Sequence, residues 1–207
     1  MLTRQKSWGC LSDCFPRGAV TGHPANRSLT QTLAPGFGQF LCRRYKDKAI
    51  IWILGGDRSI QTDDERAIID ALAAGLESGD GRNHLKTYHP TGPGFSSIKL
   101  NGADWLDFNM FQSSHGAHDH DNGLFVEHDY ALNPPKPTLD GEPRYEGMPV
   151  GFYFKGTAGI DRFDDYDARQ AAYWSVLAGA CGPRMGTTTL AVLTVRAQRE
   201  KRTPVTE

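Results

Sequence analysis

The chain has 207 residues, with 23 lysines and arginines against 24 aspartates and glutamates. This length suffices for one substantial domain with its own core. The near balance of charge argues against a broad nucleic-acid surface, and no apolar run approaches the ~20 residues that cross a bilayer. We therefore expect neither nucleic acid nor a membrane among the partners.

Residues 1–35 mix Ser, Thr, Gly, Pro and Arg without a hydrophobic period, and we expect an irregular segment there. From Phe37 an apolar face predicts a helix, because Phe37, Phe40, Leu41 and Tyr45 recur at helical spacing. The apolar run 49–54 that follows is typical of a strand covered on both faces in a parallel sheet.

A capping box begins the next predicted helix. The hydroxyl of Thr62 can accept from the amide of Glu65, and the Glu65 side chain can reach back. We expect this helix to run to about Ser78, with Gly79 as its stop. A strand over His84–His89 follows, so strand, helix and strand alternate.

The alternation continues through the second half of the chain. The helix at 165–180 is capped by Asp164 or Asp165, and it presents a face of small residues. Beyond it, 187–195 has strand propensity, within an otherwise irregular tail over 183–207. The other predicted elements are a loop at Thr91–Ser97, a strand at Trp105–Phe111, a weaker helix at Gly123–Leu132 and a short strand at Pro137–Leu139.

The four cysteines give no complete disulfide or zinc framework, although a zinc site at Cys10 and Cys14 stays open. Cys10 and Cys14 have a C-x3-C spacing without a matching second pair. Cys42 is expected to pack on a helix face, and Cys181 lies near a helix end. The sequence therefore leaves the redox compartment undecided, and we expect neither a cofactor nor a bound metal.

Four apolar segments end in polar residues that can do chemistry. Their ends fall near Asp57, His89, Gln112 and Glu142, at spacings of 32, 23 and 30 residues. A strand–helix unit of a (β/α)8 barrel takes about 31 residues, and the active site of such barrels lies at the C-terminal ends of the strands. We therefore expect these residues to line one cleft.

Asp57 and Glu142 are then two carboxylates at one barrel mouth, the requirement for glycoside hydrolysis. One protonates the departing oxygen, and the other attacks the anomeric carbon or activates water. Ordinary roles stay open for both residues. Asp57 can be a helix-cap or turn aspartate beside two glycines, and Glu142 a surface turn residue before Pro143.

Other residues on the same predicted face can bind sugar hydroxyls or stack on a sugar ring. For some of them a structural role is also open: a surface salt bridge for Arg58 and a buried hydrogen-bonded imidazole for His89. For Trp174, core packing is the more common role of an aromatic residue in a barrel. The substrate-binding candidates are Arg58, Tyr88, His89, Asn109, Gln112, His115 and Trp174.

A rival interpretation concerns the run from His115 to Asp121, which holds three histidines and two aspartates. Such residues can bind zinc and activate water in a metal-dependent hydrolase. The run lies in a glycine-containing loop, however, and no HExxH helix accompanies it.

Five motifs in order, IIWILGGDR, KTYHPTGPGFSS, WLDFNMFQSSH, PPKPTLDGEPRYEG and DARQAAYWSVLAGACG, resemble the apiosidase-like glycoside hydrolases over 37–182. The resemblance implies a TIM (β/α)8 barrel with catalytic carboxylates after strands 4 and 7. On this chain those positions are Asp57, as acid/base, and Glu142, as nucleophile of a retaining mechanism. It also implies a carbohydrate substrate of plant or pectic type.

Both ends depart from the family pattern, because 1–35 does not resemble strands 1–3 and 183–207 does not resemble strand 8. We therefore expect a partial barrel over 36–182, a truncated copy of the enzyme. The alternative is a non-catalytic or carbohydrate-binding fragment. The family is commonly found outside the cytoplasm, yet no export signal is visible here, so localisation stays open.

Overall fold

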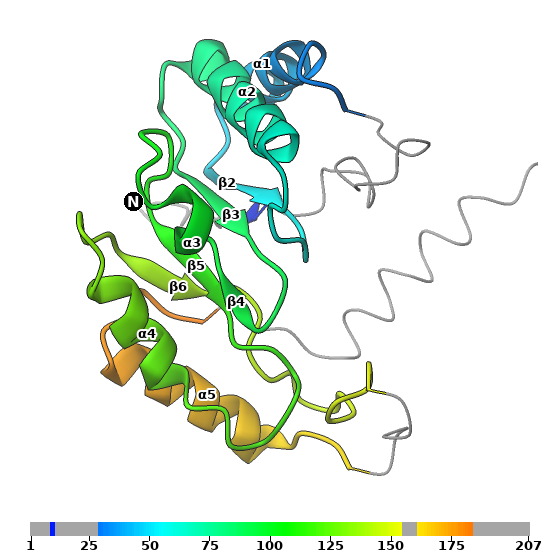
Figure 1. Cartoon of the computed structure of the whole chain (residues 1–207), viewed down its shortest axis with the longest axis vertical. Helices are drawn as coiled ribbons and strands as arrows, with labels where there is room; N and C mark the ends of the chain where they lie inside the picture. The colour runs from blue at the N-terminus through cyan, green and yellow to red at the C-terminus, as the bar shows by residue number, and fades with distance from the viewer. Residues whose placement is uncertain (1–8, 11–28, 155–160, 184–207) are drawn as a thin grey trace, which may run out of the picture. The chain divides into compact units, whose positions relative to one another are not determined.

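The computed structural model describes residues 9–10, 29–154 and 161–183 (Figure 1). Strands and helices alternate along these ranges, as the sequence predicts. The strands are β1 (Gly9–Cys10), β2 (Ile50–Gly55), β3 (Lys86–His89), β4 (Gly94–Phe95), β5 (Asn109–Gln112) and β6 (Thr138–Asp140). The helices are α1 (Ala34–Tyr45), α2 (Asp63–Asp80), α3 (Ser97–Leu100), α4 (Asn122–Tyr130) and α5 (Asp165–Leu177).

The strands form two three-stranded sheets, in the orders β1-β2-β3 and β4-β5-β6. β2 is parallel to both neighbours, with Ile50 opposite Gly9 and Trp52 opposite Lys86. β2, α2 and β3 are thus the parallel strand–helix–strand unit that the sequence predicts. The segment 1–35, expected to be irregular, contributes β1; residues 1–8 and 11–28 lie outside the described part.

The chain divides into two compact units. The first comprises 1–111 and 129–138, and the second comprises 112–128 and 139–207. β5 and β6 each begin in the first unit and end in the second. The core of the first unit packs α1 and α2 against β2, with Trp52, Leu54 and Leu72 almost fully buried.

Backbone hydrogen bonds link the strands in chain order within each unit. In the first unit, the amide of Asp107 donates to the carbonyl of Lys86 at 3.0 Å, and Asn109 donates to Pro137 at 2.8 Å. In the second unit, the amide of Ser114 donates to the carbonyl of Glu142 at 3.1 Å. Segments from successive parts of the chain are therefore hydrogen-bonded neighbours within each unit, and the barrel stays a prediction.

The helix predicted from Phe37 is present as α1, but its buried face differs from the expected one. Phe40 is 57% exposed, whereas Leu41 and Cys42 are buried together with Ala34 and Gly38. The reason is the close packing of α1 on α2 (Figure 1), which selects small residues at the contact over large apolar ones.

The capping box of α2 is confirmed, since the Thr62 hydroxyl accepts from the Glu65 amide and the Glu65 carboxylate accepts from the Thr62 amide. The predicted stop at Gly79 is wrong. Gly79 lies inside the helix, where an added Cβ would meet the Cβ of Cys42 at 2.7 Å. The helix ends instead at Asp80 and is capped by Gly81, which adopts the left-handed conformation with φ 68°.

The predicted strand at 105–111 is shorter in the structure, where β5 begins at Asn109. Trp105 lies in a turn before it and Leu106 in the irregular segment that follows, and both are buried. The indole of Trp105 donates to Asp70 at 2.7 Å. The alternation of apolar residues over 105–111 therefore reflects packing against the core of the first unit as well as strand geometry.

α5 begins at a capping box between Asp164 and Asp167, which confirms Asp164 as the cap. Its buried face contains Ala168 and Ala171, as predicted, whereas Val176 is 48% exposed. After the helix, Pro183 forms a parallel bridge with Asp140. The possible strand at 187–195 lies outside the described residues.

None of the helices within the described ranges is both long and apolar enough to cross a membrane.

Candidate active site

The loop that carries Asp57 is anchored through its backbone by the end of β3. The amide of Asp57 donates to Nδ1 of His89 at 3.0 Å, and the amide of Gly56 donates to the carbonyl of His89 at 3.3 Å. The hydroxyl of Tyr88 donates to the carbonyl of Arg58 at 2.8 Å. These contacts fix the chain position of Asp57, whose side chain is exposed.

The bend between β2 and Asp57 depends on Gly55. Its φ is 79°, and an added Cβ would meet the ring of Tyr88 at 2.7 Å. Asp57 itself has φ 56°, an uncommon value for a residue with a side chain. Such backbone conformations persist where surrounding contacts enforce them, and they cluster at functional sites.

Tyr88 and His89 were predicted to contact substrate. Both are buried, with exposed fractions of 4% each, and their described hydrogen bonds hold the Asp57 loop. Burial raises the pKa of Tyr88 well above its usual value, so the phenol is a neutral donor. These contacts favour an anchoring role for the two residues. Arg58, by contrast, is exposed beside Asp57.

The side chain of Glu142, two residues after β6, is held by two donors. Nε2 of Gln112 donates to Oε2 at 3.0 Å, and Nε2 of His115 lies 3.2 Å from Oε1. Because an ionised carboxylate only accepts, this Nε2 is the donor of the contact. The two donors fix the plane of the Glu142 carboxylate, which is 23% exposed.

A buried aspartate, Asp140, holds the loop that carries Glu142 through hydrogen bonds. It accepts from the hydroxyl of Ser113 at 2.7 Å, from the amide of Asn122 at 2.8 Å and from the backbone of Glu142 at 3.3 Å. Burial raises the pKa of Asp140 to about 6, against the opposing effect of these donors. These contacts favour a role for Asp140 in holding the loop that carries Glu142.

Aromatic side chains that sequence reasoning missed surround His115. The ring of Tyr145 lies 4.8 Å from the imidazole, and that of Phe152 lies 6.2 Å away. The backbone of Gly151 donates to the carbonyl of His115 at 2.7 Å, which ties this aromatic segment to the Glu142 site. The run GFYF at 151–154, which begins nine residues after Glu142, is the signal that could have found Phe152 and its neighbours.

Phe152, Tyr153 and Phe154 are 52%, 44% and 54% exposed. Exposed aromatic rings next to a hydrogen-bonded carboxylate can stack on the apolar faces of sugar rings. The hydroxyl of Tyr153 also lies 2.8 Å from that of Ser114, so this ring is held in place.

Two further candidates lie elsewhere in the fold. Asn109 is fully buried at the start of β5, and its amide donates to Asn101 at 3.1 Å. The start of a strand is the opposite end from the one that carries barrel active sites. Trp174, on α5, is 37% exposed and stacks under the guanidinium of Arg144 at 5.7 Å. Neither arrangement favours a sugar contact.

The histidines of the 115–121 run face separate partners. His118 bonds to Asp167 at 2.8 Å and to Asp161 at 2.9 Å, while Nδ1 of His120 donates to the carbonyl of Ser113 at 2.9 Å. Within the described residues, the metal-competent groups of three ligands do not include this run. The arrangement gives the metal-hydrolase interpretation no support.

The predicted residues thus form two groups. Asp57, Arg58, Tyr88 and His89 belong to the first unit, whereas Gln112, His115 and Glu142 belong to the second. The shared cleft of Asp57 and Glu142 stays a prediction.

Known proteins resemble this chain over most of its length. The family described as "Apiosidase-like, catalytic domain" matches residues 8–204, a wider range than the 37–182 that carries the motifs. A comparison with curated proteins finds no match.

Two solved structures are similar in fold and sequence. A glycoside hydrolase family 5 protein from Bacteroides vulgatus ATCC 8482 is 39% identical with a TM-score of 0.68, covering 77% of this chain and 36% of that one. A second structure, titled glycoside hydrolase, is 39% identical with a TM-score of 0.71, covering 82% of this chain and 40% of that one. The chain thus spans less than half the length of these relatives.

The family match, the fold of these relatives and the carboxylate-bearing strand ends agree, and the chain therefore belongs to the apiosidase-like catalytic-domain family, as a glycoside-hydrolase-like protein of mixed α/β fold.

Proposed function

We propose that the chain is the carboxylate-bearing part of a retaining glycoside hydrolase that acts on plant-type or pectic oligosaccharides. Glu142 is the nucleophile and Asp57 the acid/base. The proposal keeps the sequence-based view of a barrel whose recognisable wall comprises β2, β3, β5 and β6. Family membership and the solved glycoside hydrolases support the reaction class.

The observation that carries the proposal is the hydrogen bonding of Glu142. A nucleophile must be ionised and must keep one oxygen aimed at the anomeric carbon. The amide of Gln112 and the imidazole of His115 donate to different oxygens of Glu142, so they stabilise the charge and fix its direction. A surface turn glutamate would need neither contact.

Asp57 suits the other role. It protonates the departing oxygen and then takes a proton from water, so it changes partners during one cycle. The structure holds the backbone of Asp57 through His89 and leaves the side chain exposed. Arg58, next to it and also exposed, is proposed to bind a sugar hydroxyl.

The aromatic group beside Glu142 supports a carbohydrate substrate. Phe152 and Tyr153 expose rings within one cluster that reaches His115. Pectic chains carry acidic and neutral sugars with polar edges and apolar faces, and rings of this kind bind the faces.

The test is hydrolysis of a panel of pectic oligosaccharides by the chain, with products identified by chromatography and the first-formed anomer determined by NMR. We expect cleavage with retained configuration. Glu142→Gln and Asp57→Asn should reduce turnover, by roughly 10²–10⁴-fold for loss of the proton donor. Matched controls are Glu127→Gln and Asp47→Asn, which alter exposed carboxylates on α4 and after α1.

Azide separates the two roles. It should restore turnover to Glu142→Gly with a product of inverted configuration, and to Asp57→Gly with a product of retained configuration. Rescue with the opposite stereochemistry would exchange the assignments, and wild-type turnover from either variant would remove that residue from the reaction.

A second function is supported by the exposed aromatic run alone, namely carbohydrate binding without cleavage. In that case calorimetry would detect oligosaccharide binding that Phe152→Ala weakens, while no member of the panel is hydrolysed.

A further inference from the structure

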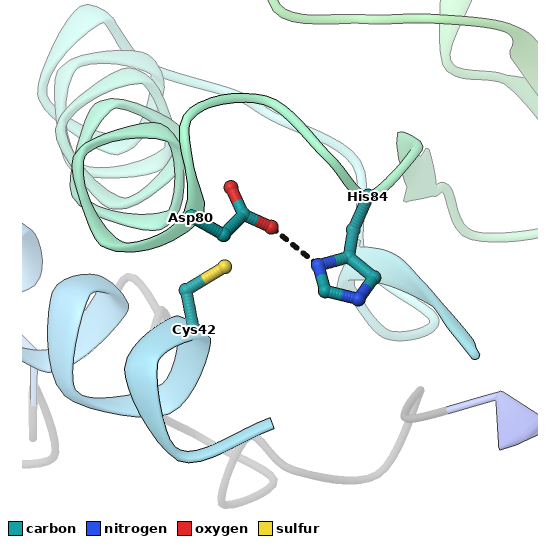
Figure 2. A group of neighbouring side chains, drawn as sticks. All are labelled: Cys42, Asp80 and His84. Carbon is teal, nitrogen blue, oxygen red and sulfur yellow. Dashed lines mark hydrogen bonds and ion pairs between the residues drawn. The ribbon is translucent and has the colours of Figure 1, made fainter. Parts of the chain in front are cut away.

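Three side chains of different chemistry meet in the first unit, away from the candidate active site. They are Cys42 from α1, Asp80 from the end of α2 and His84 from the loop before β3 (Figure 2). The sulfur, a carboxylate oxygen and a ring nitrogen lie within 4.8 Å of one another. Figure 2 shows all three side chains directed toward a common point.

This cluster is buried. Cys42 is fully buried, and the side chains of Asp80 and His84 are 3% and 7% exposed. Gly79 permits the approach, because a side chain there would collide with Cys42. Buried ionisable groups are costly unless hydrogen bonds or an opposite charge compensate them, so a positive charge beside the Asp80 carboxylate would stabilise the cluster.

The proton positions on His84 indicate what that charge can be. Nε2 lies 2.8 Å from the carbonyl of Lys48, which only accepts, so Nε2 carries a proton. Nδ1 faces the carboxylate of Asp80, another acceptor. A hydrogen on Nδ1 would satisfy this contact without a metal, and a bound cation would take the place of that hydrogen.

The same arrangement is typical of a metal ligand. Histidines that bind metals commonly donate the other ring N–H to a backbone carbonyl, which fixes the tautomer and aims the free nitrogen at the ion. Lys48 supplies that carbonyl here.

The electrostatic field of the neighbouring helix ends also favours a cation at this cluster. Asp80 is the last residue of α2, and Cys42 lies in the last turn of α1, so the negative ends of both helix dipoles point at the cluster. The nearby ammonium of Lys86 has its own counter-charges, 3.5 Å from Glu77 and 3.8 Å from Asp107.

We propose that Cys42, Asp80 and His84 bind one Zn²⁺ ion that joins α1, α2 and the loop before β3. A thiolate, an imidazole and a carboxylate are all ligands of zinc, and the mixture of sulfur and nitrogen disfavours Mg²⁺ and Ca²⁺. The thiolate and carboxylate together neutralise the ion. A water molecule would complete four-coordination, and the burial of the cluster assigns the ion a structural role.

Binding requires the Cys42 thiol to lose its proton. Without a metal, burial and the neighbouring Asp80 raise the pKa of Cys42 to about 12, although Trp52 and Lys86 act in the opposite direction. The zinc ion would displace this proton to solvent, so the apparent affinity should increase with pH.

The test is a titration of the chelator-treated chain with Co²⁺, followed by displacement with Zn²⁺. We expect a thiolate-to-cobalt charge-transfer band that saturates at one ion per chain and disappears as zinc enters. Cys42→Ser should abolish the band. Asp80→Asn preserves the shape of the side chain. It should weaken Co²⁺ binding by at least about 10–100-fold, which is the cost of losing a partner group of a metal ligand.

Cys181→Ser is the matched control, because Cys181 is an exposed free cysteine outside the cluster, and its band should equal that of the wild type. Absence of a band in the folded wild type would overturn the proposal, as would persistence of the band in Cys42→Ser. Circular dichroism establishes folding of each variant. Zinc should raise the Tm of the wild type and of Cys181→Ser, and leave that of Cys42→Ser unchanged.

Discussion

The two candidate carboxylates are held by different means. At the end of β2, His89 holds the backbone of Asp57 and leaves its side chain exposed. After β6, Gln112 and His115 hold the side chain of Glu142 itself. A side chain on a fixed backbone can turn between partners, whereas a carboxylate with two donors keeps one direction. The difference agrees with the roles proposed above, an acid/base at Asp57 and a nucleophile at Glu142.

The largest expected effect comes from Asp140, the buried support of the Glu142 loop. Asp140→Ala leaves the Ser113 hydroxyl and the Asn122 amide without their acceptor and opens a cavity. We expect a loss of about 3 kcal/mol in the free energy of unfolding, measured by urea denaturation. A loss within error of zero would mean that the Glu142 loop is supported elsewhere.

The pH dependence of the stability that Asp140 contributes is a second test of its role. Because burial raises the folded-state pKa of Asp140 from 3.8 to about 6, its contribution to stability is full below pH 4 and is lost as the pH rises through 6. Asp140→Asn should lack this pH dependence of the free energy of unfolding. The measurement is unfolding between pH 3.5 and 7, a range chosen to span the two pKa values of Asp140.

The second prediction compares the two anchors by activity. Gln112→Leu removes a donor from the Glu142 carboxylate, and we expect turnover to fall about 10²-fold, the cost of misplacing a reacting group by an ångström. His89→Leu should cost less, because Asp57 retains its chain position through Gly56 and Arg58. A larger loss for His89→Leu would reverse the comparison.

The third prediction concerns the bend before Asp57. Gly55→Ala introduces a Cβ at positive φ and 2.7 Å from the Tyr88 ring. We expect a destabilisation of about 1–3 kcal/mol, measured by thermal unfolding. Gly102→Ala is the control, because nothing lies within 4 Å of its added Cβ. Equal stability of the two variants would show that the Asp57 loop is not strained.

The smallest effect is expected at His118, in the second unit. Its hydrogen bonds to Asp167 and then Asp161 raise the pKa of His118 above 6.5. The stabilisation is therefore present below pH 6.5 and is lost as the pH rises through the folded-state pKa. His118→Gln should cost below about 1 kcal/mol at low pH, because the pair is partly exposed, and still less at pH 9, measured by urea unfolding.

Local sequence signals predicted where the helices and strands lie, but not which of their faces are buried. The capping box at Thr62 and the helix cap at Asp164 are confirmed, because in both cases the partners lie within four residues of each other. Phe40 and Gly79 were misassigned because their roles depend on the packing of α1 against α2, which no local period records. The two-residue β1 likewise exists through pairing with β2.

The residues of the candidate site also divide into those that the sequence identified and those whose role only the structure placed. The ends of the apolar runs drew attention to Gln112, His115 and Glu142, and the structure brings these three together. It could not be predicted that Tyr88 and His89 turn inward to hold the Asp57 loop, since a strand end does not reveal which side chains are buried.

By itself the sequence determined the alternation of strands and helices and the family, because hydrophobic period, capping and ordered motifs are properties of neighbouring residues. Only the tertiary structure decided which donors hold Glu142, and that Cys42, Asp80 and His84 share one buried point. Cys42 and Asp80 are 38 positions apart, and their meeting depends on how closely two helices pack. A one-dimensional pattern does not contain that distance.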